Sequence, residues 1–247
     1  MTLGIGFQCR DAIVICSDTL ITYGESHQSY EHKIYRRSDR QLSVVFTYSG
    51  FPNTMTNFVS KFEDQLSGFP QKGKEVTAYG IQNLIESILQ NSEFSEGLDL
   101  LCGIAVPNRE MRLLKALSGK IGPCSTVWDC IGSGDSSLVK SLGSLLANSV
   151  NGYSLPQAEL LGIYMIRQAS RWVPGIGGEP DVFILHSDGR VVPSARIPSG
   201  VNARFEILER HFSPVAEAFF DSRIPEDELD RRIQVLARSL KENRVLL

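Results

Sequence analysis

Two short apolar segments near the amino terminus constrain the fold more than any other feature. Residues 3–9 read Leu-Gly-Ile-Gly-Phe-Gln-Cys and residues 12–17 read Ala-Ile-Val-Ile-Cys-Ser, with only Arg10 and Asp11 between them. Two runs of this kind separated by two residues are typical of a β-hairpin. Because Arg-Asp is not the Asn-Gly pair that a tight primed turn prefers, the prediction depends on the strand pattern rather than on the turn.

A two-residue loop would set the register of this hairpin. Cys9 would then lie opposite Ala12, and pairing along the ladder would place Leu3 opposite Asp18. Residues paired across two antiparallel strands have Cβ atoms about 5 Å apart. We therefore expect Thr2 to lie beside Asp18 at the open end of the hairpin.

Lys33 would complete a group that can activate Thr2, if a neighbouring strand over residues 33–35 brings it to the hairpin. A threonine hydroxyl is a weak nucleophile until a base accepts its proton. Removal of Met1 would expose the α-amine of Thr2, a base with a reference pKa of about 8. Lys33, kept cationic by Asp18, would favour the developing alkoxide. A small second residue permits removal of the initiator methionine, so this chemistry requires no propeptide.

Each of these residues also has an ordinary structural interpretation. Thr2 stands at a position where threonine is common, and Asp18 could end its strand as a turn former. Lys33 could open its strand as a solvated side chain. The order and spacing of the three residues favour the catalytic interpretation.

Residues 2–19, followed by His32-Lys33-Ile34, resemble the start of mature proteasome β-type subunits, including their bacterial relatives of the HslV and Anbu kind. Lys33 comes one residue earlier than the family's lysine, a difference that a loop deletion accounts for. The resemblance extends along most of residues 2–195 and implies five catalytic positions: Thr2 as nucleophile, Asp18 and Lys33 as its charged partners, Gly50 in Tyr48-Ser49-Gly50 as oxyanion donor, and Ser133 in Gly132-Ser133-Gly134 as the supporting serine.

The chain departs from the family pattern before a second glycine pair. Many active β-subunits carry an aspartate and a serine just before Gly-Gly near the last helix, whereas this chain has Val173 and Ile176 before Gly177-Gly178. In the family these polar groups help to hold the supporting serine and the amine. The departure therefore favours a proteasome-like subunit with reduced or absent activity.

Three functions follow from the pattern and the resemblance. The first is a threonine-type endopeptidase that cleaves peptides or unfolded proteins and assembles with itself into a ring or a stack. The second is a catalytically inactive, proteasome-like structural subunit. The third is a small-amide amidohydrolase of the same fold, which would share the mechanism. None of the three implies a cofactor or a metal ion, and the resemblance leaves open whether a regulatory ATPase takes part.

The rest of the chain predicts alternating groups of strands and helices. Leu42 to Tyr48 alternates in the manner of a strand, and Met55 to Leu66 has apolar residues at helical spacing. Further strands are expected over residues 98–106, 111–117, 126–131, 181–187 and 190–192. Further helices are expected over residues 76–89, 138–150, 154–172 and 229–240. Residues 24–32 are expected to form a polar loop in which His27 and His32 are solvated.

This order favours an α+β fold, and with the resemblance it predicts a four-layer αββα sandwich of the N-terminal-nucleophile hydrolase type. The sandwich domain is expected over residues 1–195 and a C-terminal helical extension over residues 196–247, with a linker at residues 195–204. In such a sandwich the central strands are covered on both faces, which explains the weak polar alternation of residues 3–7 and 12–16. The extension is apolar enough to pack on its own domain or on a neighbouring subunit.

Composition narrows the class of protein. The 247 residues carry a net charge of −3, which argues against a dominant role in nucleic-acid binding. Neither a signal peptide nor a run long enough to span a bilayer is evident, so we expect a cytoplasmic protein without a membrane partner. The cysteines lack standard zinc spacing and an evident histidine partner, and free thiols are expected for Cys9, Cys16, Cys102, Cys124 and Cys130.

Overall fold

The computed structural model describes residues 2–23, 27–69, 75–124, 127–132, 137–146, 152–196, 198–220 and 223–244. The chain divides into two compact units, residues 1–195 and residues 196–247. Within the described residues, none of the helices combines the length and apolar character that crossing a membrane requires.

The first unit contains two five-stranded sheets. In spatial order, one sheet consists of β10 (Trp128–Gly132), β1 (Leu3–Gln8), β2 (Ala12–Ser17), β11 (Asp181–His186) and β12 (Val191–Pro193). The other consists of β5 (Ile34–Ser38), β6 (Ser43–Gly50), β7 (Leu98–Val106), β8 (Glu110–Leu117) and β9 (Lys120–Pro123). Every pairing in both sheets is antiparallel, so the expectation of a mixed α and β fold is confirmed.

The amino-terminal hairpin has the register that the two-residue loop predicts. Gly4 pairs with Ser17 and Gln8 pairs with Ile13, and the N–H of Cys9 donates to the carbonyl oxygen of Ala12 at 2.8 Å. At the other end, the N–H of Asp18 donates to the carbonyl oxygen of Leu3 at 3.2 Å. The open end of the hairpin therefore brings the residue after β2 next to the start of β1.

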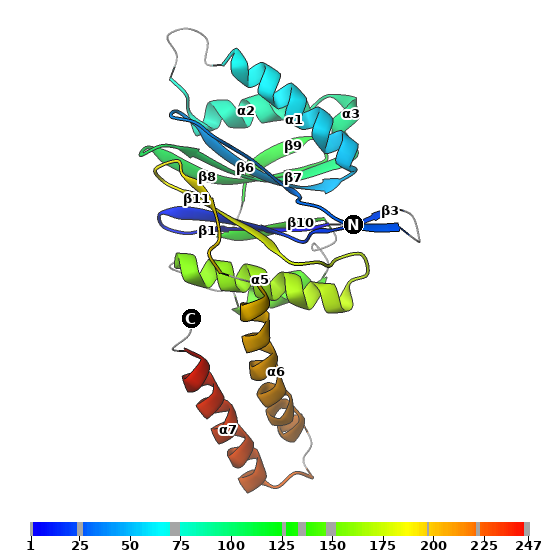
Figure 1. Cartoon of the computed structure of the whole chain (residues 1–247), viewed down its shortest axis with the longest axis vertical. Helices are drawn as coiled ribbons and strands as arrows, with labels where there is room; N and C mark the ends of the chain where they lie inside the picture. Colours follow the sequence, from blue (N-terminus) through cyan, green and yellow to red (C-terminus); the bar gives the residue numbers. More distant parts are fainter. Residues whose placement is uncertain are drawn as a thin grey trace. The chain divides into compact units, whose positions relative to one another are not determined.

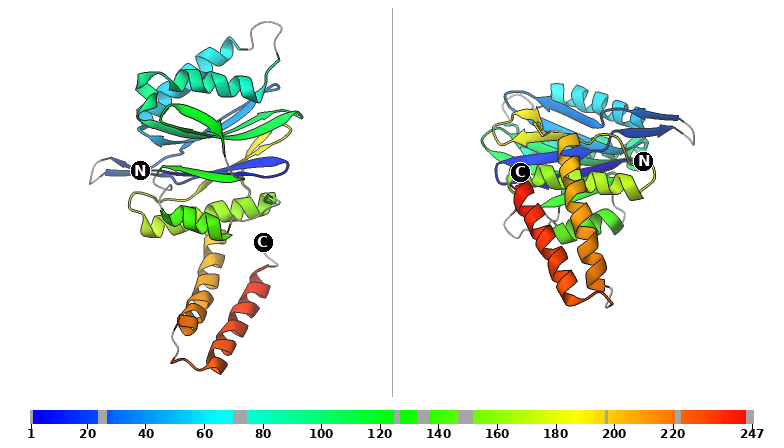
Figure 2. Two further views of the ribbon diagram at one scale, coloured as in Figure 1. Left: turned by 180° about the vertical axis from the view of Figure 1, so that it is seen from behind. Right: turned by 60° about the horizontal axis from the view of Figure 1, so that its bottom comes forward.

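Helices cover the outer faces of the two sheets (Figures 1 and 2). Beyond β5–β9 lie α1 (Pro52–Ser67), α2 (Ala78–Leu89) and the short α3 (Ser92–Ser95). Beyond the sheet that contains β1 and β2 lie α4 (Ser137–Leu146) and α5 (Leu155–Trp172). The helices predicted over residues 55–66, 76–89 and 154–172 are thus confirmed to within three residues at each end. For the helix predicted over 138–150, residues 147–150 lie outside the described part.

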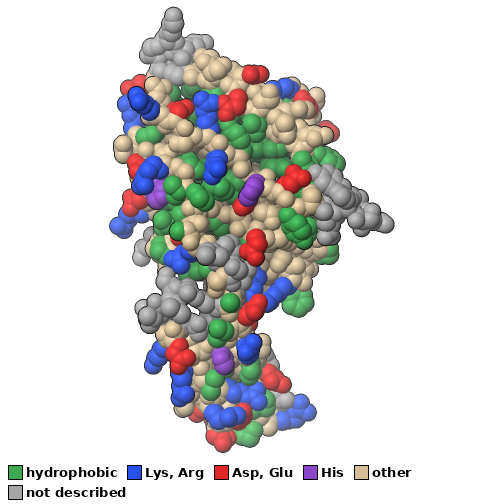
Figure 3. All heavy atoms as spheres, viewed as in Figure 1, with side chains coloured by type: hydrophobic (Ala, Val, Ile, Leu, Met, Phe, Trp, Pro, Cys, Tyr) green, Lys and Arg blue, Asp and Glu red, His purple; other side chains and the backbone are tan. Residues whose placement is uncertain are grey.

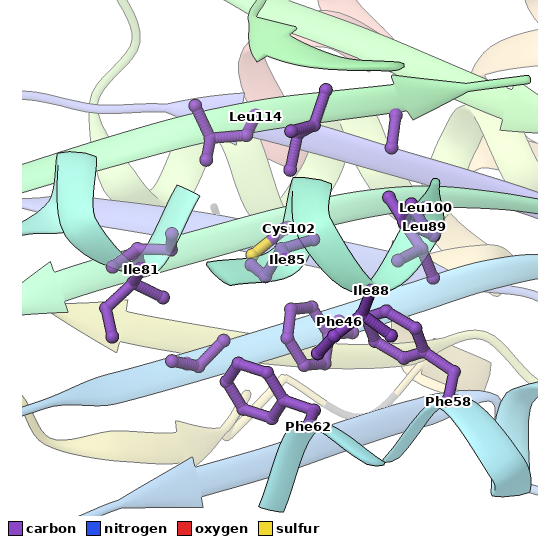
Figure 4. Close-up of a cluster of buried hydrophobic side chains, with 14 of the residues drawn as sticks. Phe46, Phe58, Phe62, Ile81, Ile85, Ile88, Leu89, Leu100, Cys102 and Leu114 are labelled. Atoms are coloured by element: carbon purple, nitrogen blue, oxygen red, sulfur yellow. The ribbon is translucent and has the colours of Figure 1, made fainter. Parts of the chain in front are cut away.

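One apolar core lies between the outer helices and β5–β9. Phe58 and Phe62 of α1 stack on each other and meet the ring of Phe46 on β6 edge to face, and Ile81 and Ile85 of α2 belong to the same cluster (Figure 4). Alternation along residues 42–48 puts every second side chain into this core, as predicted. A second core lies between the two sheets and includes Ile13, Ile15, Val45, Leu101 and Leu185.

The two sheets approach closely where β1 carries glycine. A Cβ atom on Gly4 would lie 2.6 Å from Cγ2 of Thr47, and one on Gly6 would lie 2.8 Å from Cδ1 of Leu113. Both contacts come from the opposite sheet, so even-numbered residues of β1 face the space between the sheets. The strands β1 and β2 are buried along nearly their whole length, which confirms the explanation for their weak polar alternation.

Two expectations about loops are wrong in part. Residues 20–30 include a two-stranded sheet of β3 (Leu20–Tyr23) and β4 (His27–Tyr30), where a polar loop was expected from residue 24; residues 24–26 lie outside the described part. The linker expected to reach residue 204 is shorter, because α6 (Pro198–Phe220) already begins at Pro198. In both places backbone hydrogen bonding creates regular structure without a strong apolar period.

The second unit is a pair of helices, α6 and α7 (Glu226–Arg244), that pack against each other. Arg232 of α7 donates to the carbonyl oxygen of Pro214 on α6 at 2.9 Å, and Glu228 accepts from Arg231 and Arg232. The final amphipathic helix predicted over residues 229–240 lies inside α7.

On the face of the first unit seen in Figure 3, acidic and basic side chains are interspersed rather than gathered by sign.

Candidate active site

Asp18 and Lys33 form a buried ion pair at the open end of the hairpin. Lys33 Nζ lies 3.0 Å from each carboxylate oxygen of Asp18, and it also donates to the carbonyl oxygen of Leu20 at 2.5 Å. The side chain of Asp18 is 0% exposed and that of Lys33 is 2% exposed. The structure therefore brings together two of the predicted residues that are fifteen positions apart in sequence.

Lys33 reaches this place by a different route from the one expected. It precedes β5, which belongs to the sheet opposite the hairpin, so it does not lie on a strand that pairs with the hairpin. The hairpin of β3 and β4 links Asp18 to Lys33 and returns the chain to the same end of the sandwich. The N–H of Glu31 donates to the carbonyl oxygen of Thr19 at 2.9 Å, which closes that return.

Two backbone N–H groups complete the environment of the Asp18 carboxylate. The N–H of Leu3 donates to Oδ1 at 2.8 Å, and the N–H of Gly177 donates to Oδ2 at 3.3 Å. The first belongs to the peptide bond that joins Thr2 to Leu3, so Asp18 holds the backbone one bond away from the proposed nucleophile. The second comes from the turn after α5, which sequence reasoning did not connect with the site.

Burial dominates the protonation of the pair. It lowers the pKa of the Lys33 ammonium, and the attraction and hydrogen bonds of Asp18 offset only part of that effect. Burial likewise raises the pKa of the Asp18 carboxyl, against the opposing effects of Lys33, Leu3 and Gly177. We predicted that Asp18 would keep Lys33 cationic; the lowered pKa means that Lys33 gives up a proton more readily than an exposed lysine.

Thr2 is buried beside this pair, with 5% of its surface exposed. A Cβ atom on Gly132, at the end of β10, would lie 2.2 Å from the carbonyl oxygen of Thr2 and 2.8 Å from Oγ of Ser49. Gly132 has φ of +75°, a conformation that a side chain would strain. Gly132 of one sheet and Ser49 of the other therefore meet beside the backbone of Thr2.

Gly50 ends β6 at the same end of the sandwich. Its φ is +141°, and a Cβ atom there would lie 2.1 Å from the carbonyl oxygen of Gly97, so only glycine fits. A cavity of about 200 Å³ adjoins Gly50 and Ser49 and is also lined by Glu96 and Asp99. Ser133, the remaining predicted site residue, lies outside the described residues.

The segment that departs from the family pattern lies against the pair. Val173 caps the end of α5, and Ile176 is 4% exposed and immediately precedes Gly177, whose N–H binds Asp18. The N–H groups of Thr19 and Leu20 both donate to the carbonyl oxygen of Gly177, at 3.1 and 3.0 Å. This turn is thus fixed to the site through its backbone, while its side chains at the two positions are apolar.

Other candidate chemistry lies elsewhere or is absent from the described part. All five cysteines are free thiols, as predicted, and burial raises the pKa of Cys9 to about 11 and that of Cys124 to about 12. Within the described ranges, histidine, cysteine, aspartate and glutamate form no group that could hold a metal ion. His32 is 81% exposed, but its Nδ1 lies 2.6 Å from Oδ2 of Asp181, a contact that sequence reasoning missed.

The fold is shared with proteins of known structure. A Gly-1 mutant of Anbu from Hyphomicrobium sp. strain MC1 has 17% identity and a TM-score of 0.72, covering 86% of this chain and 97% of that chain. Anbu (ancestral beta-subunit) from Yersinia bercovieri has 16% identity and a TM-score of 0.68, covering 85% and 96%. The helical assembly of the Anbu complex from Pseudomonas aeruginosa has 15% identity and a TM-score of 0.63, covering 84% and 96%. This chain has the fold of these Anbu proteins.

Neither a protein-family model nor a curated protein matches the sequence. At 15–17% identity the three structures establish the fold and nothing about individual side chains. The site is therefore interpreted from its own geometry.

Proposed function

We propose that this protein is a threonine-type N-terminal-nucleophile hydrolase that cleaves peptide bonds, with Thr2 as nucleophile after removal of Met1. The observation that carries the proposal is the buried Asp18–Lys33 pair, one peptide bond from Thr2. A buried ion pair adds little net stability to a protein, whereas buried ionisable groups with shifted pKa values are frequent at catalytic sites. The resemblance of residues 2–19 to proteasome β-type subunits supports the same assignment.

In the proposed reaction the free α-amine of Thr2 accepts the proton of its own hydroxyl. The hydroxyl oxygen then attacks the substrate carbonyl carbon, and the N–H of Gly50 stabilises the oxyanion. Collapse of the intermediate breaks the amide bond, the amine leaving group takes the proton from the α-ammonium, and an ester on Thr2 remains. Water, activated by the same amine, hydrolyses this ester and regenerates the hydroxyl.

Lys33 and Asp18 hold and polarise the nucleophile in this scheme. The positive charge of Lys33 favours the developing alkoxide, while Asp18 orients Lys33 and fixes the backbone at Leu3. Ser133 is assigned the supporting role that the family resemblance implies.

The test combines the mass of the amino terminus with turnover. Protein purified from cells is expected to begin at Thr2, and it is expected to cleave short fluorogenic peptides, whereas Thr2→Ala is expected to lose at least a hundredfold in kcat. Lys33→Met is the second inactivating variant and Lys61→Met, an exposed lysine on α1, is its control. Equal turnover by the wild type and Thr2→Ala would exclude the proposal.

A proteasome-like subunit without catalysis is the alternative that one observation favours. Val173 and Ile176 supply no polar group to the turn that contacts Asp18, so the amine and the supporting serine lack two partners that the family pattern provides. Retention of Met1 in the purified protein would select this alternative, because Thr2 would then have no free amine. Turnover of small amides with no turnover of peptides would instead select a small-amide amidohydrolase of the same mechanism.

Self-assembly is part of the proposal. One of the structures that share this fold is described as a helical assembly, and the resemblance implies a ring or a stack. We propose that copies of this chain assemble in the cytoplasm around peptide or unfolded-protein substrates. Sedimentation of the purified protein measures this directly, and a monomer at micromolar concentration would contradict it.

A further inference from the structure

Two hydroxyl side chains of β6 approach the first sheet at the position of Thr2. Oγ of Ser49 is the neighbour of Gly132, which is itself packed against the carbonyl oxygen of Thr2. The side chain of Thr47 packs on Gly4, with Oγ1 3.2 Å from the place of a Cβ atom there. Thr2 immediately precedes β1, and the alternation of that strand, continued through Thr2, turns its side chain toward the same side as Gly4. Thr47 and Ser49 therefore lie against Gly4 and Gly132 of the opposite sheet, and Gly132 in turn packs on the carbonyl oxygen of Thr2.

Thr47 also lies next to the segment that carries Lys33. It pairs with Ile34 across β5 and β6, and Ile34 is the residue after Lys33. Thr47 thus lies between β1, which follows the proposed nucleophile, and the start of β5, which follows its cationic partner Lys33.

The hydroxyl of Thr47 is unusual in its environment. Thr47 is 0% exposed, and within the part of the chain that the structure describes its Oγ1 has no hydrogen-bond partner. Buried polar atoms in folded proteins nearly always have a partner, and an unpaired one opposes folding. A hydroxyl both donates and accepts and can rotate toward a partner. The Thr2 hydroxyl, just before β1, is not bonded to Thr47 in this structure, and it is the group of the proposed reaction that Thr47 would contact once Met1 is removed.

We propose that Thr47 is a positioning residue for the nucleophile, and that its Oγ1–H donates a hydrogen bond to Oγ of Thr2 in the processed protein. This inference rests on the proposed function. A hydrogen bond donated to the Thr2 oxygen favours its deprotonated form and directs the Thr2 proton toward the α-amine. No atom is transferred to or from Thr47, so the proton balance of the reaction is unchanged.

A purely structural role for Thr47 predicts different behaviour. Threonine suits a buried strand because of its β-branch, and the methyl group alone could fill the space above Gly4. Valine would then replace it without loss, because it keeps the shape and removes an unpaired hydroxyl.

Kinetics separate the two roles. Thr47→Val is expected to lower kcat about tenfold with little change in KM, because one hydrogen bond to the reacting oxygen is lost while substrate contacts are kept. Thr47→Ser keeps the hydroxyl and is expected to retain most of kcat. Val45→Ala, on the same face of β6, is the control for disturbance of the strand and is expected to leave kcat unchanged. An unchanged kcat in Thr47→Val, or an equal loss in Thr47→Ser, would overturn the proposal.

A double-mutant cycle tests the same contact without turnover. The unfolding midpoints of Thr2→Val, Thr47→Val and the double variant are expected to be non-additive, since each single change removes the same hydrogen bond. The amino-terminal mass of each protein is measured alongside, so that processed forms are compared. Additive midpoints would refute the Thr47–Thr2 contact. Non-additive midpoints with no Thr2-dependent turnover would keep the contact and reject the proposed function.

Discussion

Asp18 concentrates the contacts of the candidate site on one carboxylate. It accepts two hydrogen bonds from Lys33 and one each from the N–H groups of Leu3 and Gly177. These donors come from β1, from the segment before β5 and from the turn after α5. Removing either charge from such a buried pair leaves the other without compensation, at a cost of about 3–5 kcal/mol.

The two charges are expected to give opposite pH dependence when each is left alone. In Lys33→Met the pKa of Asp18 in the folded protein stays above its value in the unfolded chain. The contribution of Asp18 to the free energy of unfolding is therefore fully present below about pH 3.9 and is lost as the pH rises through the folded pKa. In Asp18→Asn the pKa of Lys33 in the folded protein stays below its value in the unfolded chain. The cost of burying the charged Lys33 ammonium is therefore full at low pH, and the protein becomes more stable as the pH rises toward about 10.4. Urea unfolding from pH 5 to pH 9 measures both slopes.

The double variant Asp18→Asn/Lys33→Met is the control for these slopes. It removes both charges and leaves neither one buried alone, so its free energy of unfolding is expected to be larger than that of either single variant. Slopes of the same sign in the two single variants would contradict the assignment of the pair.

Sequence reasoning could place some of these residues and not others, for a physical reason. The register of a two-residue hairpin determines that Leu3 lies opposite Asp18, because the pairing is local and each step along it is forced. Lys33 approaches from the other sheet, and the contact of Gly177 with Asp18 spans 159 positions. Such contacts depend on how whole layers stack, which no local pattern encodes.

Helix α5 is pressed unusually close to strand β2. A Cβ atom on Gly162 would lie 2.2 Å from Sγ of Cys16, which is 0% exposed, and 3.5 Å from the ring of Phe7. The helix ends at Trp172, five residues before Gly177, so its distance from β2 also sets where the turn can contact Asp18.

Gly162→Ala is therefore expected to destabilise the protein although alanine is the better helix former. Alanine gains about 1 kcal/mol over glycine inside a helix, but overpacking of a buried site costs about 1–3 kcal/mol, and Cys16 is fully buried. We expect a net loss of about 1 kcal/mol in urea unfolding. Adding Cys16→Ala removes the obstructing sulfur and is expected to restore part of the loss beyond the effect of Cys16→Ala alone. A Gly162→Ala protein more stable than the wild type would contradict this packing.

Strands and helices were predictable where their two faces carry different kinds of residue. Residues 42–48 alternate because large apolar side chains pack under α1 and α2 while smaller ones face the other sheet, and α5 shows helical spacing because its buried residues lie on one side. The hairpin of β3 and β4 was missed because Leu20–Tyr23 and His27–Tyr30 pair as a separate two-stranded sheet, and the polar sequence of His27–Tyr30 carries no apolar alternation. The short β9 contains Lys120, Gly122 and Pro123, residues that are poor strand formers, and forms by pairing with the end of β8.

The first compact unit has a hydrophobic core of its own. Both described core clusters consist of residues between 13 and 191, and the strands that the structure describes all lie before residue 194. The second unit is a two-helix pair held by α6–α7 contacts and by Arg232. A pair of helices buries little apolar surface, so burial offsets little of the conformational entropy that folding costs. Two stacked sheets with helical layers bury much more apolar surface for each residue that is ordered.

A chain that ends at Ala195 is consequently expected to keep the fold of the first unit. It retains Thr2, Asp18, Lys33 and Gly50, so its far-ultraviolet circular dichroism should lose helix but retain strand signal, and its unfolding should remain cooperative. If the site functions as proposed, Thr2-dependent turnover per folded monomer is retained as well, which separates a catalytic need for the α6–α7 pair from a role in assembly. The matched control is the same deletion in the Thr2→Ala background, which isolates turnover due to Thr2. A truncated chain that unfolds without cooperativity would show that residues 196–247 belong to the core on which the site depends.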